Sequence, residues 1–181
     1  LEMRYYRNNI LHTYLLPSLV CRILDNHHKI SHQDLVEQVQ LIWPLLKSEF
    51  FLWQDADTLA SQVDQVLNAL ESQGIAKSTK AGFWSLTEDV CMKAYVQIMS
   101  DVIDETMQRL VIVSQLTSRL APIAKKTLEQ NMVSIANRLS ILNNINAPEF
   151  VDKKAQSALI MAMKDNGYMH VSDDNELVAE P

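Results

Sequence analysis

Residues 59–86, LASQVDQVLNALESQGIAKSTKAGFWSL, contain a change from helix to hairpin that decides the fold class. The first part carries hydrophobic side chains at helical spacing: Leu59, Val63, Val66, Leu67 and Leu70. This spacing predicts an α-helix with one buried face. Gly74 should end that helix in the left-handed conformation, with Ile75 giving the apolar contact of a Schellman motif. The runs 75–78 and 83–86 flank a short turn and predict a β-hairpin.

Two further helices are predicted upstream of this segment. The first spans about residues 3–24, and Pro17 should kink it or restart it. Ser31 is a suitable N-cap for the second helix, in which Pro44 predicts a kink near Leu41. Three helices followed by a two-stranded wing is the element order of a winged-helix unit, a relative of the helix-turn-helix.

The rest of the chain repeats this order more loosely. A long helix should begin with Thr87 as its cap and break at Ala121-Pro122. Helices are then predicted over about 126–142 and 152–165, and a second hairpin over 168–179. The sequence therefore predicts a mainly α fold.

We expect two winged-helix-like halves, each with a short β-hairpin, at residues 1–87 and 88–181. The pairs Glu49-Phe50 and Glu149-Phe150 precede the last helix of each half.

The composition favours a folded, predominantly helical protein that does not bind nucleic acid. With 181 residues, 48% of them hydrophobic, the chain can bury a substantial core, and only 3 glycines and 5 prolines interrupt it. The net charge is −6, whereas nucleic-acid binders usually present a basic face. The predicted third helix contains Asp57, Asp64 and Glu71 but no lysine or arginine, so it is poorly suited to DNA.

Cysteines and histidines give no metal or cofactor site. Cys21 and Cys91 lie in apolar helical patterns and are predicted to be buried, reduced thiols. His27, His28 and His32 fall in a polar break near acidic residues, which favours a solvated, helix-capping loop over a metal site.

Lysines and methionines in the second half could form a lipid or partner surface. Lys125-Lys126 lie in one segment, and Met161, Met163 and Met169 in another. The methionines have core spacing, which favours packing. No apolar stretch approaches the roughly 20 residues that span a bilayer.

The first predicted helix carries a dense polar and aromatic group, which we call the N-terminal cluster: Tyr5, Tyr6, Arg7, Asn8, Asn9 and His12. Such a group is unusual at a chain terminus. It suggests that the chain was cut from a longer protein and that this helix contacts the missing part. The alternative is that Arg7 pairs with an acidic side chain of the same chain.

Several blocks, in order, resemble the C-terminal region of bacterial membrane-associated glycerol-3-phosphate acyltransferases. They are YYRNNI (5–10), LPSL (16–19), PLLKSEFFL (44–52), QGI (73–75), TLE (127–129), RLSIL (138–142) and INAPEF (145–150). The resemblance covers nearly the whole chain. It implies transfer of a fatty acyl group from acyl-ACP or acyl-CoA to the 1-position of glycerol 3-phosphate in phospholipid biosynthesis.

The catalytic motif that this family implies is HX4D, in which the histidine is the general base and the aspartate orients it. The residues five positions after the histidines are Pro17, His32, Gln33, Glu37 and Asn175. None is aspartate, so we expect no catalytic residue here and no acyl transfer by this piece alone. The catalytic domain is expected upstream of Leu1.

The resemblance also implies partners and a location. The expected partner is the protein's own upstream acyltransferase domain, while the substrates bind the whole enzyme. The parent should lie peripherally at the cytoplasmic face of the inner membrane, and this piece alone should be soluble. Contact with the membrane surface or with a second copy is left open. The alternative is a stand-alone winged-helix module that binds protein or regulates.

Overall fold

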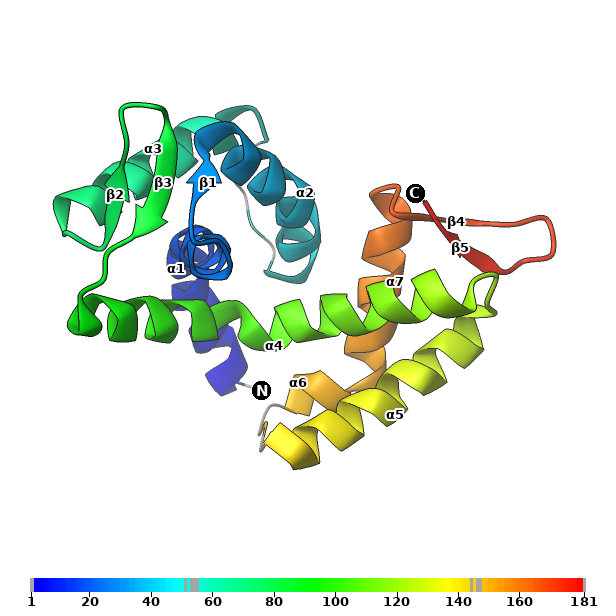
Figure 1. Ribbon diagram of the computed structural model, residues 1–181. Helices are drawn as coiled ribbons and strands as arrows, with labels where there is room; N and C mark the ends of the chain where they lie inside the picture. Colours follow the sequence, from blue (N-terminus) through cyan, green and yellow to red (C-terminus); the bar gives the residue numbers. More distant parts are fainter. Residues whose placement is uncertain (1, 51, 53–55, 144, 146–147, 181) are drawn as a thin grey trace. The chain divides into compact units, whose positions relative to one another are not determined.

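The computed structural model describes the backbone of residues 2–50, 52, 56–143, 145 and 148–180, and for 2–11, 48, 56, 148 and 149 it describes the backbone alone. Contacts divide the chain into two compact units, Leu1–Ile103 (unit 1) and Asp104–Pro181 (unit 2). The structure is mainly helical with small antiparallel sheets (Figure 1). The long helix α4 (Val90–Leu120) contributes to both units. The expected division at residue 87 thus lies before α4 and stays a prediction.

Unit 1 joins three helices to a three-stranded sheet. In chain order its elements are α1 (Glu2–Asn26), β1 (Ile30–Ser31), α2 (His32–Phe50), α3 (Ala56–Ser72), β2 (Ala76–Ser78) and β3 (Phe83–Leu86). The strand order is β1-β3-β2, with both pairs antiparallel. Trp84 is at the centre, opposite Ile30 on one side and Ser78 on the other. The predicted hairpin is confirmed, and β1 adds a third strand to it.

Local sequence signals explain where these helices begin and end. The Ser31 hydroxyl accepts a hydrogen bond from the backbone N–H of Asp34 at 3.1 Å, as an N-cap does. Gly74 has φ +72°, and the N–H of Ile75 donates to the carbonyl of Leu70 at 2.9 Å. These two features form the predicted Schellman ending of α3.

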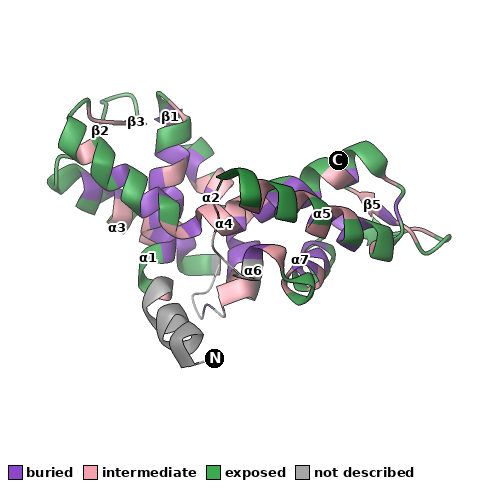
Figure 2. Cartoon of the chain, turned by 90° about the horizontal axis from the view of Figure 1, so that it is seen from below, coloured by how far each residue is buried: buried purple, intermediate pink, exposed green. Residues whose placement is uncertain are grey.

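The core of unit 1 lies where α1, α2 and α3 pack on one another. Buried residues follow the inner faces of these helices (Figure 2). The largest fully buried side chains are Trp43, Leu15, Leu19, Leu24, Leu35, Leu46, Leu59, Leu67 and Ile103. Helices α1 and α2 continue through Pro17 and Pro44, so neither proline starts a new helix.

Unit 2 has a similar order of elements, with the short additional helix α6 and with a single-residue bridge in the place of a first strand. After α4 come α5 (Lys125–Asn143), α6 (Pro148–Val151), α7 (Lys153–Asp165), β4 (Met169–Val171) and β5 (Leu177–Ala179). Ile123 forms an isolated antiparallel bridge with Leu177, in which each backbone N–H donates to the other's carbonyl at 3.0 and 2.8 Å. This bridge takes the place that β1 has in unit 1.

A buried phenylalanine and a buried amide join the helices of unit 2. Phe150 is 0% exposed, and its backbone carbonyl accepts a hydrogen bond of 2.7 Å from the Nε2 of Gln156. Asp152 caps α7 by accepting from the N–H of Lys154. Leu128 and Met132 complete the packing from α5. The helix predicted over 152–165 is therefore confirmed.

Two details of α4 differ from expectation. The cap is Asp89, which accepts from the N–H of Met92 at 3.0 Å, and Thr87 lies two residues earlier in the non-helical lead-in. Cys91 is exposed, because it falls on the outer face of the first turn. Cys21 is buried as predicted. The break before Pro122 is confirmed, since α4 ends at Leu120.

Two leucines of α5 give a matched test of the unit 2 core. Leu128 is 0% exposed and Leu142 is 77% exposed. We expect Leu128→Ala to lower the free energy of unfolding by about 2–5 kcal/mol, because it leaves a cavity. Leu142→Ala should change it by less than about 0.5 kcal/mol. Urea denaturation measures both, and equal losses would contradict the packing described for α5.

The two thiols should differ sharply in reactivity. Burial raises the pKa of Cys21 to about 12, and the negative charge of Asp25 adds to the effect. Because the thiolate is the reactive form, one thiol per native chain should react fast with a disulfide reagent at mildly alkaline pH, and two in denaturant. Cys91→Ser should remove the fast native phase. A fast phase that persists in this variant would show that Cys21 is accessible.

Candidate functional site

The structure describes one side chain of the N-terminal cluster. Tyr5, Tyr6, Arg7, Asn8 and Asn9 continue the backbone of α1, but their side chains lie outside the described residues. The side chain of His12 is half-buried and lines a groove of about 1040 Å³ in unit 1.

This polar groove runs along α1, α3 and the start of α4. Its walls include Tyr14 and Tyr95, which are 47% and 40% exposed. Glutamines and small hydroxyl residues of α3 form much of the rest, among them Gln62 and Gln65. Among the described lining residues, tyrosines aside, only His12 and Asp57 are ionisable. The groove is thus amphipathic and nearly uncharged, as protein interfaces often are.

Polar side chains brace the sheet and helices of unit 1. His32 Nε2 lies 2.6 Å from a carboxylate oxygen of Asp64, which links α2 to α3. Ser78 donates to Glu71 Oε1 from its hydroxyl at 2.6 Å and from its backbone N–H at 3.0 Å. These hydrogen bonds lower the pKa of the Glu71 carboxyl, because they favour its charged form. Their role is to hold elements together.

His27 and His170 each have a separate partner. His27 Nε2 lies 3.3 Å from the side-chain oxygen of Gln38, and His170 Nδ1 lies 2.6 Å from Glu180. Among the residues that the structure describes, no three His, Cys, Asp or Glu side chains are grouped as a metal site requires.

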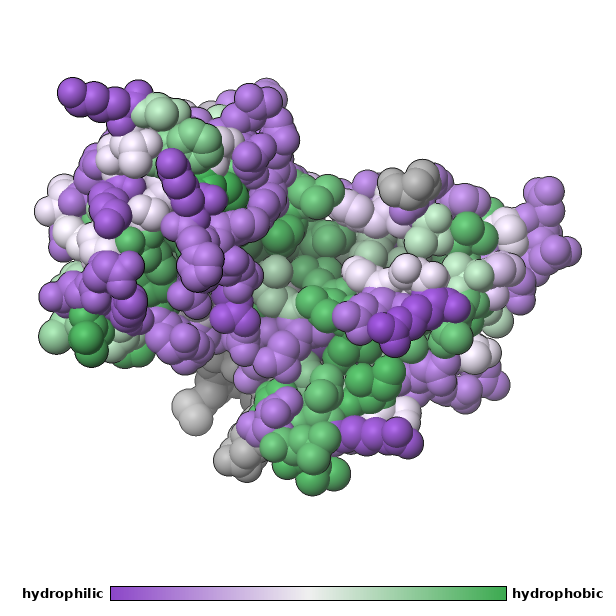
Figure 3. All heavy atoms as spheres, in the orientation of Figure 1, coloured by the Kyte–Doolittle hydropathy of each residue, from purple (hydrophilic) through white to green (hydrophobic). Residues whose placement is uncertain are grey.

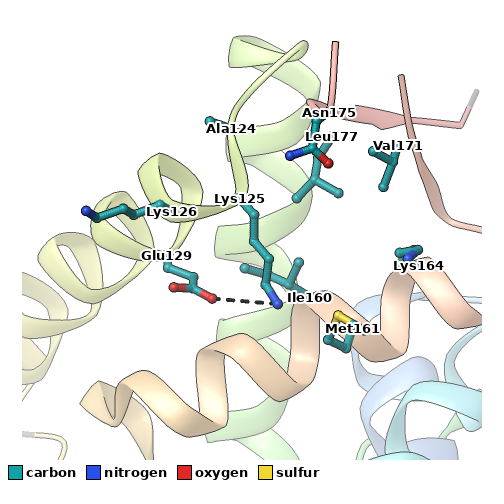
Figure 4. A pocket seen from close by; sticks show the side chains of 10 residues that line it. All are labelled: Ala124, Lys125, Lys126, Glu129, Ile160, Met161, Lys164, Val171, Asn175 and Leu177. Atoms are coloured by element: carbon teal, nitrogen blue, oxygen red, sulfur yellow. Dashed lines mark ion pairs between the residues drawn. The ribbon is translucent and has the colours of Figure 1, made fainter. Parts of the chain in front are cut away.

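Unit 2 contains a cavity of about 540 Å³ that sequence reasoning did not identify (Figure 4). We call it the lysine cavity, because its lining includes Lys125 and Lys126 at the start of α5 and Lys164 near the end of α7. Met161 also lines it and is 38% exposed, whereas Met163 and Met169 are buried as predicted. The packing role expected for Met161 is therefore wrong, because its side chain is partly exposed and lines an open space.

One buried acid lies among these cations. Glu129 is 8% exposed, and its carboxylate oxygens lie 3.9 Å from the Nζ of Lys125 and 4.0 Å from the Nζ of Lys153. Figure 4 shows Lys125 and Glu129 side by side in the cavity wall. Both contacts are longer than a hydrogen bond. Glu129 thus offsets part of the local positive charge without neutralising it.

The C-terminal end of α5 exposes apolar side chains. Ile141 is 82% exposed and Leu142 is 77% exposed. Hydrophobic residues gather there on the face shown in Figure 3. In the part of the chain that the structure describes, no helix combines the length and hydrophobicity needed to cross a membrane.

Comparison with known proteins gives a clear family. The family model for the glycerol-3-phosphate acyltransferase C-terminal region matches residues 1–172. A curated glycerol-3-phosphate acyltransferase from Colwellia psychrerythraea is 54% identical over 178 residues, which is 98% of this chain and 22% of the relative. The chain thus spans about a fifth of that relative's length. No solved structure matches. The chain belongs to the family of glycerol-3-phosphate acyltransferase C-terminal regions.

Proposed function

We propose that this chain is a non-catalytic C-terminal region that supports the acyltransferase domain of a longer glycerol-3-phosphate acyltransferase. The observation that carries the proposal is the match itself, at 54% identity across 98% of the chain but only 22% of the relative. The absence of an HX4D motif in the sequence agrees with it. The general base and its aspartate then belong to the larger, remaining part of the protein.

The whole protein would transfer a fatty acyl group from acyl-ACP or acyl-CoA to the 1-position of glycerol 3-phosphate. Its histidine would take the proton of the substrate hydroxyl as that oxygen attacks the acyl carbonyl. None of these steps involves a residue of this chain. We place the whole protein peripherally at the cytoplasmic face of the inner membrane, as its family implies.

We also propose that both units are winged-helix-like. In unit 1 the order α1, β1, α2, α3, β2, β3 and the sheet order β1-β3-β2 support this proposal. In unit 2 the bridge between Ile123 and Leu177 joins the start of α5 to the hairpin in the same way. Helix α3 carries acidic residues and no lysine or arginine, which favours protein contacts over DNA contacts.

The surface that would contact the acyltransferase domain is the N-terminal cluster together with the polar groove. The cluster lies on α1, and His12 is the member that also lines the groove. The groove offers two partly exposed tyrosines and almost no charge. Tyrosine is enriched at interfaces because its ring buries much area while its hydroxyl keeps a polar partner.

Two neighbouring positions of α3 allow a sharp test in the full-length protein. Ala69 lines the groove, whereas Asn68 does not, and both are exposed. Ala69→Arg should place a long cation where the partner domain docks, and lower acyltransferase activity about tenfold or more through a cost of about 1.4 kcal/mol. Asn68→Arg should leave activity within about twofold, because it projects away from the groove.

Limited proteolysis provides a second readout of the same proposal. Loss of docking should make Ala69→Arg protein release this region faster than the Asn68→Arg control does. Tyr6→Ala and Arg7→Ala test the N-terminal cluster in parallel. Wild-type activity, stability and membrane association in all three docking variants would refute the proposal and favour a stand-alone interaction module.

A further inference from the structure

The lysine cavity of unit 2 concentrates positive charge in a protein whose net charge is −6. Three lysines and one glutamate line it, which leaves a formal charge of +2 on its wall. Lys125 and Lys164 come from different helices, and Figure 4 shows Lys125 extending into this space and Lys164 on its other side. The Lys126 side chain extends away from both in the same view. Two lysines that are 39 positions apart in the chain thus share one space.

The start of α5 adds backbone charge to the same space. The first N–H groups of any helix have no acceptor within the helix, and the helix dipole makes this end positive. Ala124, Lys125 and Lys126 at this end all line the cavity. The first turn of α5 contains no acidic residue, and alanine has no side-chain acceptor with which to cap it. Lysines are unfavourable at such an end unless an anion lies close.

A second cavity of similar volume does not share the positive charge of the lysine cavity. A cavity in unit 1 also measures about 540 Å³, but Asp34 and Glu37 line it together with Lys29. The Lys29 ammonium lies 4.4 Å from the centre of the Phe83 ring, in a cation–π contact. The net formal charge of these three groups is −1. Accumulated positive charge therefore distinguishes the cavity of unit 2.

The remaining lining indicates the size and chemistry of a ligand. A volume of about 540 Å³ is typical of small-molecule sites. Ile160 and Leu177 give buried apolar contacts, and the Asn175 side chain lies at the rim in Figure 4. Lysine is a common ligand of phosphate, and two ammonium groups on opposite sides of one space suit a dianion with three oxygens.

We propose that the lysine cavity binds a phosphate monoester group, carried either by a small soluble molecule or by a lipid headgroup. Lys125 and Lys164 would contact the phosphate oxygens from two sides, and the first N–H groups of α5 would donate to them. Glu129 holds Lys125 in place and limits the affinity. This site involves unit 2 alone, so it does not depend on the docking proposal for unit 1.

The test is a titration of the 181-residue chain with inorganic phosphate at constant ionic strength, followed by the amide NMR signals of residues 125–128. Wild-type protein should show saturable shifts at these amides. Lys125→Gln combined with Lys164→Gln should weaken phosphate binding about tenfold, since two charges near the ligand are lost. Lys154→Gln removes an exposed lysine of α7 outside the cavity and should change the affinity less than about twofold.

Glu129→Gln gives the opposite sign and guards against trivial loss of folding. Removing the one acid of the lining should tighten phosphate binding about threefold. If the double lysine variant does not fold, this tightening decides the test alone. No saturable shift in wild type, no tightening in Glu129→Gln, or equal weakening by Lys154→Gln would each overturn the proposal.

Vesicles distinguish the two sources of the phosphate. We would compare sedimentation of the chain with pure phosphatidylcholine and with equal parts phosphatidylcholine and phosphatidic acid, whose headgroup is a phosphate monoester. Retention that requires phosphatidic acid, Lys125 and Lys164 assigns the cavity to a lipid headgroup. Phosphate-dependent NMR shifts without such retention assign it to a soluble phosphate monoester.

Discussion

The backbone pairing between the segment that follows the first helix of each unit and the last strand of its hairpin holds the structure together. In unit 1, Ile30 pairs with Trp84 across 54 residues, and in unit 2, Ile123 pairs with Leu177 across the same separation. Each pairing closes a long loop, so its cost in chain entropy must be met by the helices packed inside it. The buried ring of Phe150 and the fully buried Trp43 show that this packing is dense.

The same pairing creates the lysine cavity. Ile123 is fixed to Leu177, so Ala124 and Lys125 follow directly beside the hairpin. Helix α7 then brings Lys164 to the other side. The start of α5 and the end of α7 thus meet at the strand that the bridge anchors, although neither carries a recognisable motif. A longer β1-like strand before α5 would set the helix start further from the hairpin.

The sequence predicted the helices and hairpins far better than it predicted that the start of α5 lies beside the end of α7. Hydrophobic spacing and Gly74 located α3 and its hairpin, because both depend on residues close in the chain. The lysine cavity depends on Lys125 and Lys164, whose proximity follows from a single-residue bridge too short to leave a strand pattern. The cap predicted at Thr87 and the burial predicted for Cys91 are wrong, because helical spacing does not fix the residue at which a helix begins. The polar groove likewise combines α1, α3 and α4.

The two units have similar element orders, but unit 2 places two lysines at the start of α5, and this placement costs free energy. Lys125 and Lys126 at the positive end of α5 oppose the helix dipole, at about 0.3–1 kcal/mol each. Glu129, one turn later, lies in position to recover part of that cost through its contact with Lys125. The first turn of α5 contains no acidic residue that could offset the same cost for Lys126. A bound anion would relieve both lysines together, so phosphate should stabilise unit 2 as well as occupy it.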